Sequence, residues 1–488
     1  MSSVKHITCS MCSCLCDNIE ITIEKDKIKR IKNGCSMCTK FIKYNKKHRL
    51  IEPMSWENGK RVPVSLTKAV YKAAKILVNA KYPIFYGWAS TTSETIDVGV
   101  KIAEEVGGVY DNCAINCPDS SSLGIQQAGI SQADLGQIRH RAELVICWGY
   151  NPIVTHPKLF GKTIIGQKGK YTKGNIIKCY NKNTLYGNQQ KDPKDIFGDE
   201  TAIQRYPANV PNEIKKLTDS QLDRKLIVVD VEQTATAEIG DYFIKIEPNS
   251  DFELFQALRV LIKGGELDVN SVAGIPVEKI EKIADILINS RFGVIFWSTN
   301  NGTVQNRGNT EAAIQLVRDL NNRTKFVMMP VHGCFNTVAS NLVTSWLTGY
   351  PHSVDFSMGY PRYNPGETSI NNILQRREND ASLIIDAPPR SAYPKKLIDH
   401  VTKNPLIILE SHENALTLMA DIAIPVAVSG IEASGTAYRM DNVPVTLKKA
   451  IDPPGGILTD KEILNMIFAK VKELKSENKR ITNHLFCA

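Results

Sequence analysis

From about residue 55 onward, the hydrophobic positions form short apolar runs that alternate with amphipathic segments. The runs are rich in β-branched residues and lack polar alternation, as expected for parallel strands buried on both faces. Residues 93–107 and 309–322 have the spacing of amphipathic helices. This alternation predicts α/β domains with doubly wound parallel sheets and right-handed crossovers. The predicted strands are 82–88, 142–149, 225–230, 292–298, 381–387 and 405–411.

Each predicted strand ends in glycine or polar residues. Turns favour such residues, so one strand end of this kind means little. Ligands of open α/β sheets bind beyond the carboxyl ends of the strands, and six polar ends in one chain predict a large, extended ligand. None of the six is a G-x-G-x-x-G or a G-x-x-x-x-G-K-S motif, which argues against an ordinary dinucleotide fold or P-loop. The glycine or polar residues at the ends of the six predicted strands are Gly87, Gly149, Asp230, Ser298, Asp386 and Glu410.

The first 38 residues hold six of the twelve cysteines, at positions 9, 12, 14, 16, 35 and 38. The subset Cys9-x2-Cys12-x3-Cys16-x18-Cys35 has the spacing of ligands to a [4Fe–4S] cluster. Residues 19–31 alternate isoleucine with polar residues and predict a hairpin that turns at 25–27 and returns Cys35 to the loop. Cys14 and Cys38 are then spare, although either can replace Cys16 or Cys35. The alternative is a structural zinc site with Cys35–Cys38 as the second ligand pair.

Length and composition set further limits. The 488 residues, of which 42% are hydrophobic, can form two to four domains. No run of about 18 apolar residues predicts a membrane span, and the amino terminus lacks a signal core, so we expect a cytoplasmic protein without a disulfide framework. The net charge of +9 comes from lysines spread along the chain without a nucleic-acid-binding motif, so we expect no nucleic-acid partner. The polar, lysine-rich stretch 162–224 predicts a surface insertion.

Cys117 precedes Pro118, and proline is favoured in the first turn of a helix. The following residues, 119–142, have amphipathic spacing. At a helix start, free N–H groups stabilise a thiolate, the form that ligates metal. On these residues alone, a small buried hydrophobic cysteine remains the better interpretation.

The four-cysteine pattern followed by α/β domains resembles the molybdopterin oxidoreductases, which carry a tungsten or molybdenum bis(molybdopterin guanine dinucleotide). More narrowly, "TEAAIQLVRDLNNRTKF", "TGYPHSVDFSMGYPRYNPGETS" and "GIEASGTAYRMDNVP" are similar to the B subunits of formylmethanofuran dehydrogenases. The same holds for "CWGYNPIVTHP" and "IVVDVEQTATA". The resemblance covers nearly the whole chain apart from 162–224.

The resemblance implies a function. In that family the subunit reduces carbon dioxide to formate at the pterin-bound metal, with electrons relayed through its cluster. An amidohydrolase-like partner then condenses the formate with methanofuran. The match implies that Cys117 ligates tungsten or molybdenum and that Asp230 binds a guanine. The alternative at each of the other predicted cofactor-binding positions is a strand-end turn or cap. These positions are Asn151, His156, Thr299, Asn300, Gly302, Asn364, Glu432, Gly435 and Thr436.

Two positions depart from the family pattern. Pro118 stands where the family has a histidine, and His332 where it has an arginine. We expect His332 to be a catalytic residue, because a histidine, with an unperturbed pKa of about 6.5, can supply a charge or a proton, although it is not bidentate as arginine is. Cys334 is a further new group nearby. The alternative for His332 is a histidine of the hydrophobic core. The alternatives for the whole protein are a cofactor-binding paralogue with another substrate or no catalysis, and an α/β scaffold with a structural zinc site.

The resemblance also implies the domain organisation and the partners. The expected fold is a multi-domain molybdopterin oxidoreductase fold that has a small amino-terminal iron–sulfur domain and lacks the carboxyl-terminal barrel. A separate small subunit is expected to supply the barrel, beside ferredoxin-like electron-transfer subunits. The predicted parts are a cluster domain at 1–55, one pterin-binding domain at 56–161 with 225–290, the insertion at 162–224, and a second pterin-binding domain at 291–488.

Overall fold

The computed structural model describes residues 2–25, 27–44, 47–112, 120–165, 224–298, 307–385 and 399–486. The chain forms two compact units, one of residues 1–117 with 333–488 and one of residues 118–332. These breaks lie at other residues than the domain boundaries drawn from the sequence, because the first unit joins segments from both ends of the chain.

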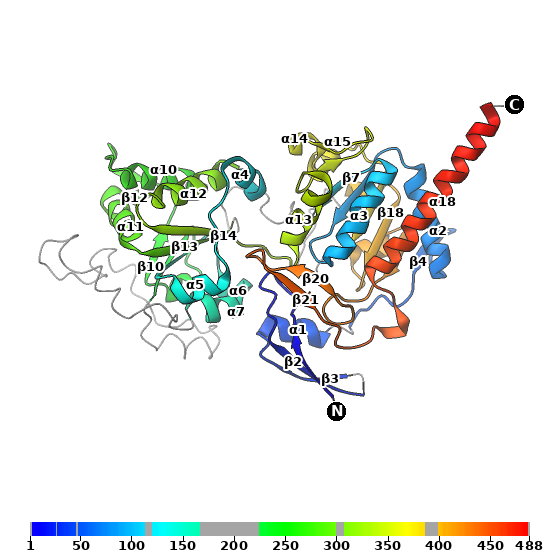
Figure 1. Cartoon of the computed structure of the whole chain (residues 1–488), viewed down its shortest axis with the longest axis horizontal. Helices are drawn as coiled ribbons and strands as arrows, with labels where there is room; N and C mark the ends of the chain where they lie inside the picture. Colours follow the sequence, from blue (N-terminus) through cyan, green and yellow to red (C-terminus); the bar gives the residue numbers. More distant parts are fainter. Residues whose placement is uncertain are drawn as a thin grey trace, which may run out of the picture. The chain divides into compact units, whose positions relative to one another are not determined.

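The unit of residues 118–332 contains a five-stranded, fully parallel sheet in the order β10-β9-β8-β13-β14 (Figure 1). Each buried strand is an apolar run, which matches burial on both faces. The strands are β8 (Leu144–Trp148), β9 (Lys225–Asp230), β10 (Tyr242–Lys245), β13 (Phe292–Trp297) and β14 (Lys325–Pro330), with a small hairpin of β11 (Ser271–Val272) and β12 (Ile275–Pro276). The helices are α4 (Ser120–Ala128), α5 (Leu135–Arg141), α6 (Pro152–Thr155), α7 (Pro157–Leu159), a π-helical turn (Phe160–Ile164), a 3-10 turn (Ala237–Ile239), α10 (Asp251–Ile262), α11 (Val277–Asn289) and α12 (Arg307–Leu320).

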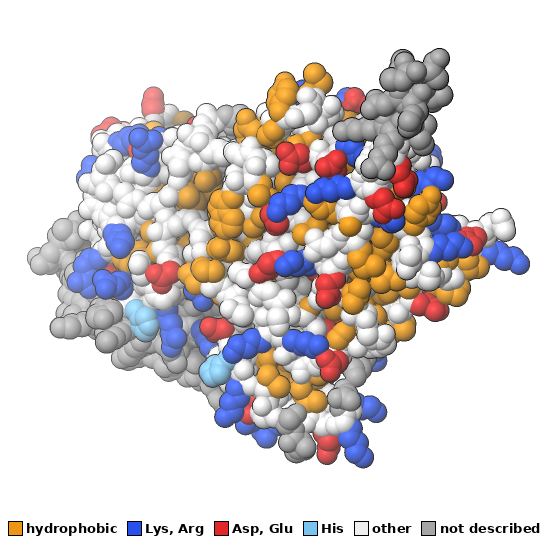
Figure 2. Space-filling model, turned by 45° about the vertical axis from the view of Figure 1, so that its right-hand side comes forward, with side chains coloured by type: hydrophobic (Ala, Val, Ile, Leu, Met, Phe, Trp, Pro, Cys, Tyr) orange, Lys and Arg blue, Asp and Glu red, His pale blue; other side chains and the backbone are white. Residues whose placement is uncertain are grey.

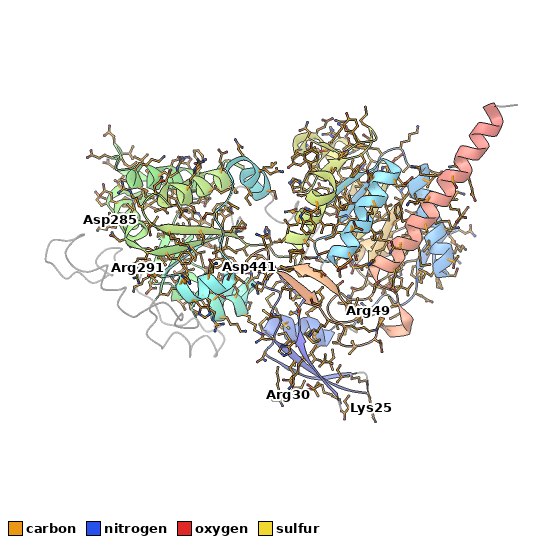
Figure 3. All side chains as sticks on the ribbon, viewed as in Figure 1. Lys25, Arg30, Arg49, Asp285, Arg291 and Asp441 are labelled. Atoms are coloured by element: carbon orange, nitrogen blue, oxygen red, sulfur yellow. The ribbon has the colours of Figure 1, made fainter. Side chains whose placement is uncertain are left out.

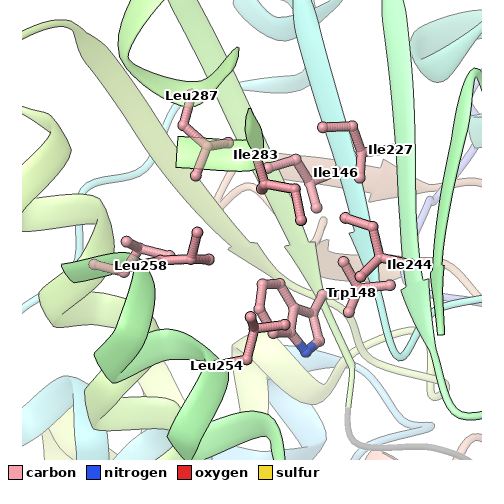
Figure 4. A pocket seen from close by; sticks show the side chains of 10 residues that line it. Ile146, Trp148, Ile227, Ile244, Leu254, Leu258, Ile283 and Leu287 are labelled. Carbon is pink, nitrogen blue, oxygen red and sulfur yellow. The ribbon is translucent and has the colours of Figure 1, made fainter. Parts of the chain in front are cut away.

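The core of this unit lies where α10, α11 and α12 pack on the sheet. Trp148 stacks on Phe255 with ring centroids 4.0 Å apart. The gap left beside Trp148 measures about 10 Å³ and is lined by apolar side chains (Figure 4). A gap of that size holds one water at most, so the interior of this unit is a packed core and offers no ligand cavity there.

The other unit contains a nine-stranded sheet in the order β16-β15-β7-β6-β17-β18-β19-β4-β5. Strands β7 to β19 are parallel, and β15, β16, β4 and β5 extend the two edges as antiparallel strands. The strands are β4 (Met54–Glu57), β5 (Lys60–Pro63), β6 (Pro83–Gly87), β7 (Val109–Asn112), β15 (Val354–Asp355), β16 (Arg362–Tyr363), β17 (Ala381–Ile385), β18 (Leu406–Glu410) and β19 (Ile422–Pro425).

Helices cover both faces of the nine-stranded sheet. One face packs on α2 (Leu66–Asn79), α3 (Ser93–Val106), α13 (Thr337–Thr348) and α18 (Asp460–Phe486). The other face packs on α15 (Ile370–Arg376) and α17 (Ala415–Met419). The short helix α14 (Pro365–Thr368) and a 3-10 turn (Pro454–Gly456) also belong to this unit. The predicted doubly wound α/β architecture is therefore confirmed for this sheet.

The amino-terminal segment forms a small antiparallel sheet in the same unit. It consists of β1 (Ser2–Ile7), β2 (Ile19–Glu24) and β3 (Lys27–Lys32), and the helix α1 (Ser36–Tyr44) follows. The predicted hairpin is present as β2 and β3, which pair antiparallel from Glu20 opposite Lys32 to Glu24 opposite Lys27. The isoleucines of β2 face inward and pack with Val428, Ile431 and Ile451. A two-stranded ribbon, β20 (Gly435–Tyr438) and β21 (Pro444–Leu447), lies in the carboxyl-terminal part of this unit.

All six predicted strands and both predicted helices are present, with ends shifted by at most a few residues. The amphipathic run at 119–142 differs from a single helix, because it breaks into α4 and α5. Gly129, with φ of +71°, ends α4 in the left-handed region, and Asp134 accepts a hydrogen bond from Gln137 N at 2.8 Å to cap α5. In the part of the chain that the structure describes, no helix is long and apolar enough to cross a membrane.

Candidate cofactor site

The six cysteines of the amino-terminal segment converge in one group of thiols. The Cys9 thiol is hydrogen-bonded to that of Cys38, and the Cys14 thiol to that of Cys12. Cys9 N donates to Cys16 O at 2.9 Å and closes the loop, while Cys38 N donates to the Cys35 sulfur at 3.4 Å. The loop and the start of α1 together therefore present six sulfur atoms to one place.

Crowding makes these thiols hard to ionise. The pKa of Cys9 is raised by its hydrogen bond to Cys38, by burial and by the neighbouring thiols. The pKa of Cys14 is raised by its hydrogen bond to Cys12, by burial and by further thiols. Burial also raises the pKa of Cys35. A group of thiolates that repel one another is stabilised by a bound cation, and two pairs of close cysteines suit an iron–sulfur cluster or a zinc ion. Cys14 and Cys38 lie within the group, so proximity alone does not select the four ligands.

Glu432 takes part in a buried ion pair. Its carboxylate lies 2.8 Å from Arg49 Nη2, and the side chains of Glu432 and Arg49 are only 0% and 3% exposed. Figure 3 labels Arg49. The same Glu432 oxygen accepts a hydrogen bond from Val428 N at 3.0 Å, and Arg49 donates to Val426 O at 3.3 Å. The pair thus fixes the chain just after β19, and this carboxylate already has a charged partner without any cofactor.

Replacing Arg49 by methionine is expected to lower the free energy of unfolding by about 3–5 kcal/mol, because Glu432 is left as a buried, unpaired charge. The double variant Arg49→Met/Glu432→Leu should recover most of the loss, since burying the two charges costs nearly as much as their attraction returns. Denaturant unfolding checks both, with Lys101→Met, which removes an exposed pair to Asp97, as the control. A double variant that stays as unstable as Arg49→Met contradicts the pairing argument.

Gly435 and Thr436 are held against the start of α3. Thr436 N and Oγ1 donate to the two carboxylate oxygens of Glu94, at 3.0 and 2.7 Å. Burial alone raises the pKa of Glu94, but these bonds outweigh it and the pKa lies below its usual value. A Cβ at Gly435 would lie 2.5 Å from Thr92 Cγ2, so only glycine fits this approach of β20 to α3. Both residues therefore have a packing role in this unit.

Asn364 caps the short helix α14. Its main-chain oxygen accepts from Glu367 N and Thr368 N at 2.7 Å, and its side chain donates to the Glu367 carboxylate at 3.1 Å. The arrangement is that of a local turn, which is the alternative to cofactor binding at each of the predicted cofactor-binding positions. A role in cofactor binding stays a prediction for this residue.

In the unit of residues 118–332, the structure joins three predicted site residues. Asn151, at the end of β8, accepts a hydrogen bond from Thr236 Oγ1 at 2.7 Å. His156, five residues on, is buried, and its Nε2 lies 3.2 Å from the main-chain oxygen of His332. The ring of Tyr150 lies beside that of His156, with centroids 5.6 Å apart. The polar end of β8 is therefore tied to the chain just after β14, at the carboxyl edge of the sheet.

Asp230, the last residue of β9, is 3% exposed. One carboxylate oxygen accepts a hydrogen bond from Val231 N at 2.8 Å, and the other, Oδ2, is buried with no hydrogen-bond partner among the described residues. Burial raises the pKa to about 6, aided by the charges of Glu232 and Asp251 and opposed by main-chain N–H groups. A buried acceptor without a donor is costly and fits a ligand that brings N–H groups.

Replacing Asp230 by asparagine is expected to stabilise the cofactor-free chain above pH 6. The pKa is raised from 3.8 to about 6 on folding, so the folded chain binds an extra proton between these values and stability falls as the pH rises through them. The cost, up to about 3 kcal/mol, is present in full above pH 6 and is absent below about pH 4. Unfolding measured from about pH 4 to about pH 8 should lose this slope in Asp230→Asn and keep it in Asp268→Asn, which changes an exposed acid of the same unit. An unchanged slope in Asp230→Asn contradicts the assignment.

Cys117, Thr299, Asn300 and Gly302 lie outside the described residues, as does Asp386. Sequence reasoning missed two buried polar groups of the larger unit. Asn336 donates to Thr91 O and accepts from Tyr438 N, both at 2.7 Å. Asp111, at the end of β7, accepts from Asn112 N, Ser353 N and Ile370 N. Neither stands in a motif, and only its place inside an apolar stretch marks it.

No model of a known protein family matches the chain. Two curated relatives do, and both are B subunits of a tungsten-containing formylmethanofuran dehydrogenase 2. That of Methanocaldococcus jannaschii is 38% identical over 477 residues, which cover 96% of this chain and 99% of the relative. That of Methanococcus maripaludis is 35% identical over 481 residues, which cover 97% and 100%.

Two solved structures share the fold. A chain of the formyltransferase/hydrolase complex FhcABCD of Methylorubrum extorquens, in complex with methylofuran, matches with a TM-score of 0.63 and 17% identity, over 85% of this chain and 98% of that one. Acetylene hydratase of Pelobacter acetylenicus matches with a TM-score of 0.64 and 12% identity, over 96% of this chain and 69% of that one. At such identities the likeness concerns the fold, and it agrees with the mixed α/β architecture with parallel sheets.

Proposed function

Because this chain belongs to the family of formylmethanofuran dehydrogenase B subunits, we propose that it is the redox subunit of such an enzyme. In this role it reduces carbon dioxide to formate at a tungsten or molybdenum bis(molybdopterin guanine dinucleotide), with electrons from a [4Fe–4S] cluster. A partner subunit then condenses the formate with methanofuran. The observation that carries the proposal is the convergence of six thiols at the amino terminus, in a chain whose curated relatives contain tungsten.

The thiol group fits an iron–sulfur cluster. Cys9, Cys12, Cys16 and Cys35 would hold it, and the inward face of the small sheet keeps one side of the group apolar. Hydrogen bonds to sulfur and burial set the potential of such clusters, and the bond from Cys38 N to the Cys35 sulfur is of this kind. The small sheet, α1 and the cysteine loop then form the iron–sulfur domain of the family.

The second cofactor fits the polar strand ends. Asp230 would accept the N–H groups of a guanine with its buried, unpartnered oxygen, and Asn151 and His156 would line the same strand edge. We assign the metal ligand to Cys117, and further contacts to Thr299, Asn300, Gly302, Asn364, Glu432, Gly435 and Thr436. When bound, the metal–pterin group supplies two-electron redox chemistry.

In this proposal His332 acts on the substrate. Its main-chain oxygen is held by His156, which positions the residue just beyond β14. Its imidazole would donate a proton or orient the carboxylate-like substrate, the task of the arginine found in the family, but with one contact in place of two. Pro118 has no side chain able to move a proton, so proton handling would rest on His332.

The relatives are named as subunits, and the FhcABCD structure is a multi-subunit complex. We therefore propose a hetero-oligomer containing an amidohydrolase-like subunit, a small barrel subunit that completes the pterin site, and ferredoxin-like electron-transfer subunits. The departures from the family pattern at Pro118 and His332 favour one second candidate, a paralogue that binds the cofactors and has another substrate or no catalysis.

Elemental analysis of the complex purified without oxygen tests the proposal. We expect about four iron atoms per copy of this chain beyond those of the partners, together with one tungsten or molybdenum. Iron without tungsten or molybdenum would favour the paralogue that has lost the chemistry. Zinc in place of iron would favour the α/β scaffold with a structural metal and would overturn the redox function.

A further inference from the structure

The iron–sulfur segment carries a large part of the positive charge of the chain. Residues 1–44 contain eight Lys or Arg and four Asp or Glu, a net charge of +4 out of +9 for the whole chain. Lysine and arginine side chains (blue) border the lowest part of the molecule in Figure 2, where β2 and β3 lie in Figure 1. A large share of the net positive charge therefore lies in the segment that holds the thiols.

The basic side chains project from the outer face and the edges of the small sheet. The isoleucines of β2 and β3 point inward. The basic side chains exposed along β3 are Lys27, Lys29, Arg30 and Lys32, and Lys5 is exposed on β1. Figure 3 labels Arg30. Glu20 and Glu24 neutralise part of the charge through ion pairs with Lys32 and Lys29, each at 3.4 Å. Lys27 and Arg30 have no ion-pair partner within the described part of the chain.

Protection of the sheet edge explains only part of this pattern. Lysines on an edge strand discourage pairing with another chain, which accounts for β3. It does not account for Lys40 and Lys43, which are exposed on α1, the helix whose first turn contains Cys38. Basic groups thus surround the thiols on several elements, and the inner face of the sheet packs directly on Cys9 and Cys38. The outer face lies only the thickness of one sheet, on the order of 10 Å, from the thiols.

We propose that the outer face of the sheet β1–β3, with Lys5, Lys27 and Arg30, is the docking surface for an acidic iron–sulfur electron-transfer protein. The proposal rests on the proposed function, because it takes the thiols to hold a [4Fe–4S] cluster. In the docked complex one electron leaves the reduced cluster of the donor, which is oxidised, and reduces the cluster of this chain. Opposite charges steer such encounters and raise their rate, and salt screens the effect.

The test uses the full chain, purified without oxygen with its cluster, and a reduced plant-type [2Fe–2S] ferredoxin as the acidic donor. The variant Lys5→Glu/Lys27→Glu/Arg30→Glu reverses the charge of the surface. The matched control Lys60→Glu/Lys75→Glu/Lys461→Glu reverses three exposed lysines of the same unit away from the small sheet. Stopped-flow absorbance gives the second-order rate constant of electron transfer at several salt concentrations, and calorimetric titration with oxidised ferredoxin gives the affinity.

At low salt we expect the surface variant to lose about 10-fold or more of the rate constant, to bind ferredoxin more weakly, and to lose most of its salt dependence. The control variant should behave as the unchanged chain does, and dithionite should reduce the cluster of all three at similar rates. Equal ferredoxin rates and affinities for the surface variant and the unchanged chain would overturn the docking surface while leaving the redox function intact. Absence of a cluster from every preparation would instead defeat the proposed function, and the titration would still decide whether the surface binds an acidic protein.

Discussion

Replacement of Cys117 by alanine is expected to abolish the reduction of carbon dioxide while leaving the iron content of the chain unchanged. Alanine has no group to ligate the tungsten or molybdenum, and even residues that only support metal ligands are worth about 10–100-fold in activity or affinity. We therefore expect a loss of more than about 100-fold. The iron should remain, because the thiols that we propose to hold the cluster come from residues 9–38, far away in the sequence.

The position of Cys117 in the chain supports this expectation. Residues 113–119 follow β7 directly, and ligands of open α/β sheets bind beyond the carboxyl ends of such strands. Asp111 and Asn112, the last residues of β7, are fully engaged in hydrogen bonds that hold this strand end in place. A strand end held in this way is the kind of support that a metal centre requires.

Cys113 provides the matched control, because it is a cysteine of the same segment four residues earlier. Cys113→Ala should retain activity, tungsten or molybdenum, and iron. Unchanged turnover in Cys117→Ala would remove this residue from the mechanism. Equal losses in both variants would show that the segment tolerates no change and that the assignment of the ligand rests on the resemblance alone.

The strands could be predicted because a parallel strand covered on both faces must be apolar along its whole length. β9 (Lys225–Asp230) is the clearest case, since its predicted and observed ends agree. The pairing of strands could not be predicted. β8 and β13 are neighbours in one sheet although about 140 residues separate them, and their apolar patterns do not specify a partner. The antiparallel strands β4 and β15 are too short and too mixed in composition to stand out.

The candidate site divides in the same way. Spacing identified the cysteine group, because metal ligands on one loop must be close in sequence. The surroundings of Glu432 could not be found by such reasoning, since its partner Arg49 is 383 residues away and becomes a neighbour only through the fold. Asp230 could be predicted from its place at a strand end. Its unpartnered oxygen could not, because it depends on the absence of a hydrogen-bond donor nearby among the described residues of the folded unit.

Replacing Cys9 by serine is expected to remove the iron–sulfur cluster and with it all electron transfer through the chain. A serine oxygen is a poor substitute for a soft thiolate as an iron ligand. The Cys9 thiol is buried, hydrogen-bonded to the Cys38 thiol and close to Cys12 and Cys16. Iron and acid-labile sulfide should fall to background in this variant, and the spectrum of a reduced cluster should be lost.

The same substitution at Cys14 tests whether a thiol that lies in the group is also a ligand of the proposed cluster. Cys14 is as buried as Cys9 and is bonded to Cys12, so Cys14→Ser disturbs the group to a similar extent but should keep its iron. Cys38→Ser should keep it as well, and Cys147→Ala, at a buried thiol inside β8, controls for the loss of any buried cysteine. Full iron in Cys9→Ser together with loss in Cys14→Ser or Cys38→Ser would show that the cluster uses one of the spare thiols. Because the thiols lie within one group, that result would change one ligand of the proposed cluster without changing its place, and the argument for the proposed docking surface would stand.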